Sequence, residues 1–318
     1  MRRRCRHPNC SSACARRRRL PIVRRDRRQE AAVADHSRPR AAEREAIGFE
    51  FTDRDFRRVC RMIYARAGIH LAEHKRDMVY SRLSRRLRTH GFARFCDYLD
   101  FVEAEPAAEE QAFINALTTN LTAFFREAHH FDALRDQLRA VPRGAVVDIW
   151  CCAASTGEEP WSLAITACEA FASDTPPVRI LATDIDTNAL AGAARGEYGI
   201  ERITDLSAER KRRFFLRGTG PHEGLVRVKP FLRQLVEFRQ LNLLAPDYGL
   251  RQQFLAVFCR NVMIYFDKPT QYEVLRKVAP LLAPGGRFYA GHSESFAHAL
   301  DLVQPCGRTI YRATREAR

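Results

Sequence analysis

The fold is decided by the stretch Ala145-Val146-Val147-Asp148-Ile149-Trp150, the loop Ala153-Ala154-Ser155-Thr156-Gly157, the run Glu158-Glu159-Pro160 and the stretch Arg179-Ile180-Leu181-Ala182-Thr183-Asp184. The two apolar stretches predict strands, the small residues predict a tight loop, and Glu158 opens a helix. In such a strand–loop–helix–strand unit, small residues let the backbone approach a nucleoside. The carboxylate of Asp184, at the tip of the second strand, is placed to accept both ribose hydroxyls.

The glycine count of this loop distinguishes the possible cofactors. A dinucleotide site needs three glycines so that a pyrophosphate can lie on the helix N-terminus. Here only Gly157 is present, and the acids Glu158 and Glu159 that follow it repel a phosphate. S-adenosylmethionine has a ribose, an adenine and a cationic sulfonium but no phosphate, so it fits better. Taken alone, the unit is also compatible with an ordinary βαβ unit that has an acid at a strand end.

The positive charge of the chain is concentrated at its N-terminus. The chain has 318 residues and a net charge of +15, and its first 40 residues hold 14 arginines against Asp26, Glu30 and Asp35. Only +4 remains for residues 41–318, which argues against a nucleic-acid-binding surface on the folded part. The first 48 residues have almost no large apolar side chains, so we predict a disordered extension there.

The sequence also bears on location and metals. The longest apolar stretch of the extension is Leu20-Pro21-Ile22-Val23, shorter than the about 7–15 residues of a secretory signal, and no run approaches the roughly 18 apolar residues of a membrane span. We therefore expect a cytoplasmic protein with no membrane insertion, whose ten cysteines are reduced thiols. Cys5, His7, Cys10 and Cys14 offer zinc ligands, but they lack paired C-x-x-C spacing, and no metal site is predicted.

Five segments of the chain occur in an order that resembles one family. They are Thr119–Glu127, Ala154–Pro160, Thr183–Asp186, Arg217–Val228 and Phe258–Phe266. In this order they resemble the CheR chemotaxis methyltransferases, over roughly residues 49 to 312. The resemblance implies transfer of a methyl group from S-adenosylmethionine to glutamate side chains of chemoreceptors, with S-adenosylhomocysteine as the other product.

The resemblance and the strand pattern together define the expected fold. We expect an α/β fold: a Rossmann-like methyltransferase domain with a small antiparallel β-subdomain insertion, preceded by a small all-α domain. The expected segments are 1–48 (extension), 49–118 (helical substrate-recognition domain), 119–142 (linker helix) and 143–318 (methyltransferase domain), with the insertion at about 205–231. Further strands are expected at 235–238, 254–258, 287–290 and 309–313, and a helix at 269–282.

Helical spacing defines the front of the chain. Thr52 and Asp55 form a predicted capping box, and Gly68 ends that helix. A second helix is expected from about Lys75 to Thr89. One arc of it carries four basic residues: Lys75, Arg82, Arg85 and Arg86. A solvated face explains such an arc equally well, but the resemblance implies that Arg82, Arg85 and Arg86 contact the Glu-rich helices of the receptor.

The expected cofactor residues come from the linker and from strand ends. By resemblance the linker folds over the cofactor, and Asn120, Thr122 and Arg126 contact it, as does Glu159. In open parallel sheets ligands bind at the carboxyl ends of strands. The positions there are Asp184, Asn242 with Leu243, which resemble an adenine contact, and Arg260 with Asn261. His129 and His130 are adjacent in sequence, so we expect them to face different directions and to be structural.

The expected chemistry needs no general base. A glutamate with a pKa of about 4.3 is ionised at neutral pH, so the protein only aligns and desolvates the reactants for an in-line displacement at the sulfonium methyl. We place Tyr265 and Arg126 nearest the transferring methyl group: the tyrosine steadies the sulfonium charge and the arginine orients a carboxylate. A core aromatic is the alternative for Tyr265.

The insertion contains three glycines and a proline before the alternating strand Leu225-Val226-Arg227-Val228, which predicts a small antiparallel sheet with an open edge. By resemblance this sheet adds a receptor's C-terminal tether peptide as an extra strand, with Gly218, Gly224 and Arg227 in the binding surface. The enzyme is expected to act as a monomer, recruited to receptor arrays at the inner membrane face. Two alternatives stay open: a nucleic-acid methyltransferase, suggested by the pI of 9.8, and a catalytically silent module that binds the cofactor or the receptors.

Overall fold

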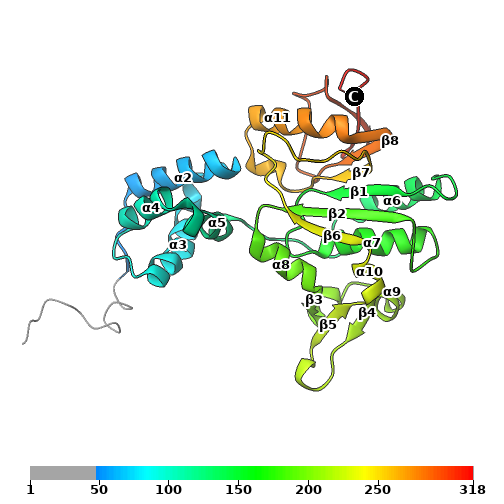
Figure 1. Cartoon of the computed structure of the whole chain (residues 1–318), viewed down its shortest axis with the longest axis horizontal. Coiled ribbons are helices and arrows are strands. Elements are labelled where there is room, and N and C mark those ends of the chain that lie inside the picture. The colour runs from blue at the N-terminus through cyan, green and yellow to red at the C-terminus, as the bar shows by residue number, and fades with distance from the viewer. Residues whose placement is uncertain (1–47, 318) are drawn as a thin grey trace, which may run out of the picture. The chain divides into compact units, whose positions relative to one another are not determined.

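The computed structural model describes residues 48–317 (Figure 1). Its first lobe is helical: α2 (Asp53–Ala67), α3 (Arg76–His90), α4 (Phe95–Ala104) and α5 (Pro106–Leu117), with a 3-10 turn at Glu73–Lys75. The capping box is present, since Asp55 N donates to Thr52 Oγ1 over 3.2 Å, and Gly68 ends α2 with a φ of +68°. The helices enclose a core of their own, with Val59, Leu83 and Phe113 at its centre.

The second lobe contains a seven-stranded sheet of strand order β6-β2-β1-β7-β8-β10-β9. The strands are β1 (Val147–Cys151), β2 (Val178–Asp184), β6 (Val236–Gln240), β7 (Phe254–Phe258), β8 (Leu282–Tyr289), β9 (Val303–Gly307) and β10 (Ile310–Ala313). The first five in spatial order are parallel, and β10 is antiparallel to both of its neighbours. The expected α/β fold with a preceding helical domain is therefore confirmed.

Helices cover both faces of this sheet because its strands alternate their side chains. Ile149 and Cys151 of β1 pack against α6 (His129–Arg139) and α7 (Glu158–Ala170). Trp150 points to the other face, where α11 (Lys268–Val278) packs. Helix α8 (Thr187–Arg195) lies against β2 and β6.

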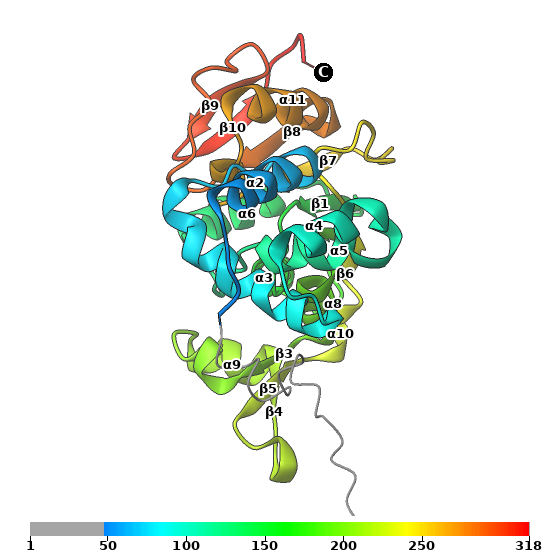
Figure 2. The ribbon, with the colours of Figure 1, turned by 90° about the vertical axis from the view of Figure 1, so that its left-hand side faces the viewer.

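The helical lobe lies in front of the strands in Figure 2, which views the molecule from that side. Direct hydrogen bonds join the two lobes: Tyr265 O accepts from His70 N over 2.9 Å, and Asn242 Nδ2 donates to Arg66 O over 2.7 Å. Both residues of the sheet lobe follow the carboxyl ends of strands. The helical lobe thus covers the edge of the sheet where ligands bind in this class of fold.

A separate sheet of order β3-β5-β4 is formed by β3 (Glu197–Gly199), β4 (Phe215–Arg217) and β5 (Leu225–Val228). It is flanked by α9 (Ala208–Phe214), α10 (Pro230–Arg233) and the 3-10 turns Ile200–Ile203 and Gly220–His222. The antiparallel insertion is present, but the expected start at about residue 205 is wrong because β3 precedes it. A three-residue strand ending in glycine has no alternating pattern to reveal it.

Other boundaries also differ from the expectation. The linker is helical only in α6, and residues 119–128 have no helix. The expected helix 269–282 ends at Val278 and a 3-10 turn Ala279–Leu281 follows, since β8 already begins at Leu282. Strand β9 was not expected; Pro305 and Gly307 within it mask the strand pattern. In the described residues no helix is both long and apolar enough to cross a bilayer.

Candidate functional site

A cavity of about 430 Å³ lies between the two lobes at the carboxyl ends of β1, β2, β6 and β7. This volume is within the range of small-molecule sites. Every residue predicted to contact the cofactor lines it, and so does Tyr265. The set is Asn120, Thr122, Arg126, Glu159, Asp184, Asn242, Leu243, Arg260, Asn261 and Tyr265. The helical lobe adds lining residues that the sequence did not indicate, among them Ile69, His70 and Met78.

Asp184 ends β2 and is oriented by the backbone around it. Its Oδ2 accepts from Ser155 N over 2.7 Å, and its Oδ1 accepts from Asp186 N over 2.9 Å. Burial raises the pKa of Asp184, and these backbone hydrogen bonds oppose the rise. Each carboxylate oxygen has room for a second hydrogen bond. A pair of vicinal hydroxyls is therefore a suitable ligand for this side chain.

The small residues of the loop after β1 allow the chain to pass close to α8. Gly157 has a φ of +100°, and a Cβ at this position would lie 2.8 Å from the Cβ of Ala193. Any side chain here would therefore push α7 away from α8. The single glycine serves helix packing, and no three-glycine pyrophosphate cradle is present in this loop.

Arg260 is buried between two carboxylates. Its Nη1 donates to Glu159 Oε2 over 2.5 Å, and its Nη2 lies 3.3 Å from Glu127 Oε2. Its Nη2 also donates to the carbonyl oxygen of Arg126 over 2.5 Å, which fastens the linker to the end of β7. Arg260 and Glu159 line the cavity as an ion pair, whereas Glu127 is not among the lining residues.

The linker is held over the loop after β1 by polar side chains. Asn120 Nδ2 donates to Asp186 Oδ2 over 2.7 Å, and Asn120 Oδ1 accepts from Ser155 Oγ over 3.2 Å. Arg126 donates to Leu121 O over 3.0 Å. Phe125 and Glu127 have φ angles of +55° and +58°, a strained conformation for residues with a Cβ. The linker thus has one defined path beside the cavity.

Two predicted contacts are already engaged within the protein. Asn242 Oδ1 accepts from Leu244 N over 2.9 Å, and its Nδ2 bonds to the helical lobe as described above. Glu159 is bound by Arg260, and its Oε1 accepts from Cys151 Sγ over 3.3 Å. These two residues shape the cavity wall, and their contact with the cofactor stays a prediction.

The loop from Asn261 to Tyr265 depends on an acid that the sequence analysis missed. Asn261 has a φ of +58°, and Glu294 accepts from the backbone N–H groups of Val262 (3.0 Å) and Met263 (2.8 Å). Burial raises the pKa of Glu294, and the backbone hydrogen bonds oppose the rise. Glu294 lies about thirty residues away in sequence, so no local motif could indicate it.

The predicted receptor-binding arc on α3 is only partly available. Arg82 donates to Thr118 O, at the C-terminus of α5, and Arg86 binds the buried Glu109 over 2.6 and 2.7 Å. Their guanidinium groups hold α3 against α5. Arg85 is exposed. The expectation of a free three-arginine face is therefore wrong, because packing of α5 against α3 turns two of the three inward.

The predicted open edge of the small sheet is also misplaced. Arg227 lies on β5, which is the central strand, so its backbone is paired on both sides. Its side chain is half exposed, 3.6 Å from Glu197. Position 218 requires glycine for a structural reason, since a Cβ there would lie 2.0 Å from His222 O. Gly224 has a φ of +81°, which also favours glycine. Within residues 48–317 the free edges of this sheet are β3 and β4.

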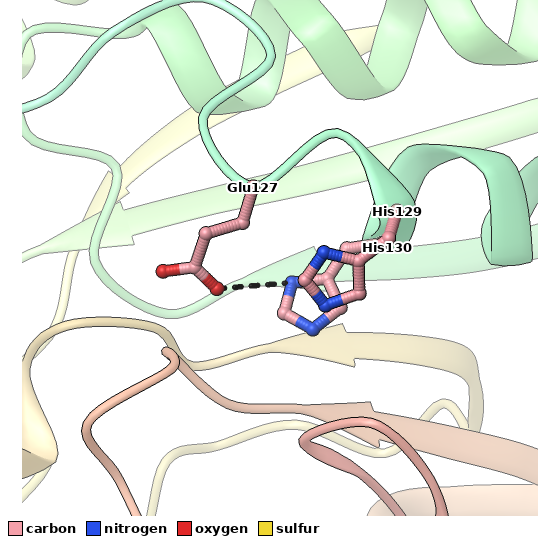
Figure 3. A group of neighbouring side chains, drawn as sticks. All are labelled: Glu127, His129 and His130. Carbon is pink, nitrogen blue, oxygen red and sulfur yellow. Dashed lines mark ion pairs between the residues drawn. The ribbon is translucent and has the colours of Figure 1, made fainter.

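His129 and His130 do not face different directions as expected. Their ring centroids lie 4.1 Å apart, and both rings approach Glu127 (Figure 3). Glu127 has a positive φ just before α6, and its Oε2 lies 3.5 Å from His130 Nδ1. The candidate zinc ligands Cys5, His7, Cys10 and Cys14 lie outside the described residues.

Comparison with known proteins agrees with this geometry. Residues 54–118 match the all-alpha domain of CheR methyltransferases, and residues 120–312 match the SAM-binding domain of the same family. The chain is 54% identical to chemotaxis protein methyltransferase 2 of Pseudomonas aeruginosa over 264 residues, covering 83% of this chain and 94% of that protein. It is 50% identical to the chemotaxis protein methyltransferase of Escherichia coli over 266 residues, covering 83% and 92%.

These matches decide between the functions that the sequence left open. Both family domains are present in order, and the relatives share about half of their residues with this chain over nearly their full length. The activity of this family is methylation of chemoreceptors. It is neither methylation of nucleic acids nor binding without catalysis. The chain belongs to the CheR family and is an S-adenosylmethionine-dependent chemotaxis methyltransferase, the enzyme class that methylates chemoreceptors.

Proposed function

We propose that this enzyme methylates glutamate carboxylates on chemoreceptor helices that dock at the mouth of the cavity between the two lobes. The observation that carries the proposal is that Asp184, suited to two hydroxyls, lines one cavity together with the carboxylate of Glu159 and the aromatic residue Tyr265. A ribose and a sulfonium cation are the two groups of S-adenosylmethionine that such a site would bind.

The reaction balances without a proton donor or acceptor. When bound, S-adenosylmethionine supplies an electrophilic methyl group and a thioether leaving group. A glutamate carboxylate oxygen forms the new C–O bond, and the electron pair of the broken C–S bond stays on sulfur. With an ordinary pKa of about 4.3, the acceptor is ionised at neutral pH. The protein's work is therefore alignment and exclusion of water.

Tyr265 and Arg126 are the residues proposed to act on the reacting groups. Tyr265 is partly buried in the cavity wall, where its ring can face the sulfonium. Arg126 also lines the cavity, and its guanidinium is bound only to a backbone carbonyl among the described residues, so it can orient the incoming carboxylate.

The experiment is transfer of a labelled methyl group to membranes that contain the organism's own receptors, with base-labile label as evidence of an ester. Tyr265→Ala should lower kcat up to about 30-fold, the equivalent of about 2 kcal/mol, while Tyr265→Phe keeps most of the rate because the ring is retained. The control is Tyr272→Ala, which changes a tyrosine of α11 whose hydroxyl donates to Asp301. Receptors that stay unlabelled while nucleic acid is labelled would contradict the proposal.

We further propose that a receptor tether peptide adds to β4 and that Arg85 contributes to docking of the receptor helices. Leu216 on β4 is 47% exposed, which offers an apolar contact beside the free edge. Arg85 retains a solvent-exposed guanidinium that would attract Glu-rich helices. In this proposal the enzyme acts as a monomer that is recruited to receptor arrays.

A further inference from the structure

Three potential metal ligands meet at the start of α6, outside the contacts proposed for methyl transfer. They are Glu127, His129 and His130, each with one ligand atom within 4.8 Å of the others (Figure 3). Among residues 48–317, three of their buried atoms have no hydrogen-bond partner: Glu127 Oε2, His129 Nε2 and His130 Nδ1. Buried polar atoms nearly always have partners. Glu127 Oε2 has an ion pair with Arg260, so the two histidine nitrogens are the atoms that need an explanation.

One ring nitrogen of His130 is engaged by Thr309. His130 Nε2 lies 2.8 Å from the hydroxyl oxygen of Thr309, which also lies 2.8 Å from Arg308 O. When the hydroxyl donates to Arg308 O, its oxygen accepts from His130 Nε2, and Nδ1 of the neutral ring carries a lone pair.

In the tautomer with the proton on Nε2, His130 Nδ1 and Glu127 Oε2 present two electron pairs to each other. His130 Nδ1 lies 3.5 Å from Glu127 Oε2, and the side chain of His130 is fully buried. Two lone pairs at this distance repel each other in a medium of low dielectric constant unless a positive group lies between them. Arg260 approaches Glu127 Oε2 at 3.3 Å and compensates the carboxylate, but no hydrogen bond in the described residues reaches His130 Nδ1.

We propose that Glu127, His129 and His130 form a binding site for a divalent transition metal ion of the zinc type. Two imidazole nitrogens and one carboxylate oxygen favour Zn²⁺, Co²⁺ or Ni²⁺ over Mg²⁺ and Ca²⁺, which prefer oxygen ligands. The side-chain atoms of Glu127 and His130 that would not bind the metal already have partners, as is usual for metal ligands. Glu127 Oε1 lies 3.0 Å from His292 Nδ1, and His130 Nε2 is bound to Thr309.

The charge of Arg260 opposes a metal at this site, but Glu159 compensates it. The guanidinium makes its shortest ion pair, 2.5 Å, with Glu159 on the side away from Glu127. The metal would fix the strained residue Glu127, which directly follows Arg126. The site would thus stabilise the linker beside the cavity, which is a role in structure and goes beyond the proposed function.

The test measures Co²⁺ binding to the untagged full-length chain after chelator treatment, by visible absorption and calorimetry. Cys5→Ser, Cys10→Ser and Cys14→Ser are introduced together as the background, so that the N-terminal thiols contribute no ligand. We expect one Co²⁺ per chain with absorption bands typical of nitrogen and oxygen ligands, and a higher Tm with the metal. In the same background Mg²⁺ should not compete.

His129→Ala should weaken Co²⁺ binding more than about 100-fold, because loss of even an outer partner of a ligand costs 10–100-fold. His129→Gln is the second variant in case the alanine variant does not fold, as judged by circular dichroism. His222→Ala changes a histidine in the small subdomain and should leave affinity unchanged. Absence of stoichiometric Co²⁺ binding, or equal affinity in the His129 and His222 variants, would overturn the proposal and leave a bridging water as the occupant.

Discussion

At the scale of one residue, we expect the side chain of Asp184 to decide cofactor affinity. Two backbone N–H groups orient the carboxylate and leave one acceptor site on each oxygen for a ribose hydroxyl. We expect Asp184→Asn to weaken S-adenosylmethionine binding about 10- to 100-fold, since two charge-assisted hydrogen bonds of about 1.5–3 kcal/mol each are weakened but not removed. Isothermal titration calorimetry gives the affinity.

The control for this prediction is Asp148→Asn. Asp148 lies on the neighbouring strand β1, away from the cavity, where it forms an ion pair of 2.7 Å with Arg179. This exchange removes a carboxylate from the same sheet and should leave affinity unchanged. If both variants bind S-adenosylmethionine as tightly as the parent does, Asp184 is not a ribose ligand.

Helices α3, α4 and α5 are joined by one buried carboxylate. Glu109 accepts from Arg86 and from Tyr98, whose hydroxyl lies 2.8 Å away. Burial alone would raise the pKa of Glu109, but the hydrogen bonds from Arg86, Tyr98 and His90 outweigh it and hold the pKa below its ordinary value. The unfolded chain therefore takes up this proton first as the pH falls. The stabilisation is fully present above about pH 4.3 and is lost as the pH falls through the folded pKa.

Glu109→Gln should therefore lower the free energy of unfolding at pH 7 by about 2 kcal/mol. This value is below that of a fully buried ion pair because the side chain of Arg86 is a quarter exposed. The difference in free energy of unfolding between this variant and the parent should become smaller as the pH falls below 4. Urea unfolding between pH 3 and 7 measures it. Glu103→Gln, which breaks the exposed ion pair with Arg58, should cost less than about 1 kcal/mol. A difference for Glu109→Gln that is constant over this pH range would contradict the assignment.

Strand β4 lies at the edge of the small sheet, and alternate residues of it point their backbone N–H and C=O groups away from β5. Lys229 N donates to Phe214 O, and Gly218 N donates to Leu225 O. Because paired residues alternate along an antiparallel ladder, the backbone groups of Phe215 and Arg217 face away from β5. Arg217→Pro removes one of these outward N–H groups without removing a bond of the ladder.

We expect Arg217→Pro to raise the receptor concentration needed for half-maximal methylation roughly tenfold or more, with kcat unchanged, since a tether acts through effective concentration. Glu197→Pro is the matched change at the other edge, on β3, and should have little effect. Receptors with and without the C-terminal peptide serve as substrates. Equal behaviour of the two proline variants, or a loss of cofactor affinity, would contradict tether binding at β4.

For the molecule as a whole, the cavity depends on both lobes of one unit. The described residues of Phe49–Arg318 contain all lining residues, and the family match covers residues 54–312. We therefore expect a chain that begins at Phe49 to keep the kcat and the cofactor affinity of the full-length chain. Methylation assays on both chains measure this, with circular dichroism as the control for folding. A truncated chain that folds but loses turnover would assign a catalytic role to residues 1–48.

The sequence by itself determined the strand–loop–helix–strand unit, the capped first helix and the residues at the strand ends that line the cavity. These features depend on local spacing, and the carboxyl ends of parallel strands necessarily meet at one edge. Tertiary structure alone decided four others. It turned Arg82 and Arg86 toward α5, placed Arg227 on a central strand, brought Glu294 under the Asn261 loop, and collected Glu127 and the two histidines. The first three depend on which element packs against which, over separations in sequence that no periodicity can carry. The last depends on the local backbone path at Glu127, whose φ is positive.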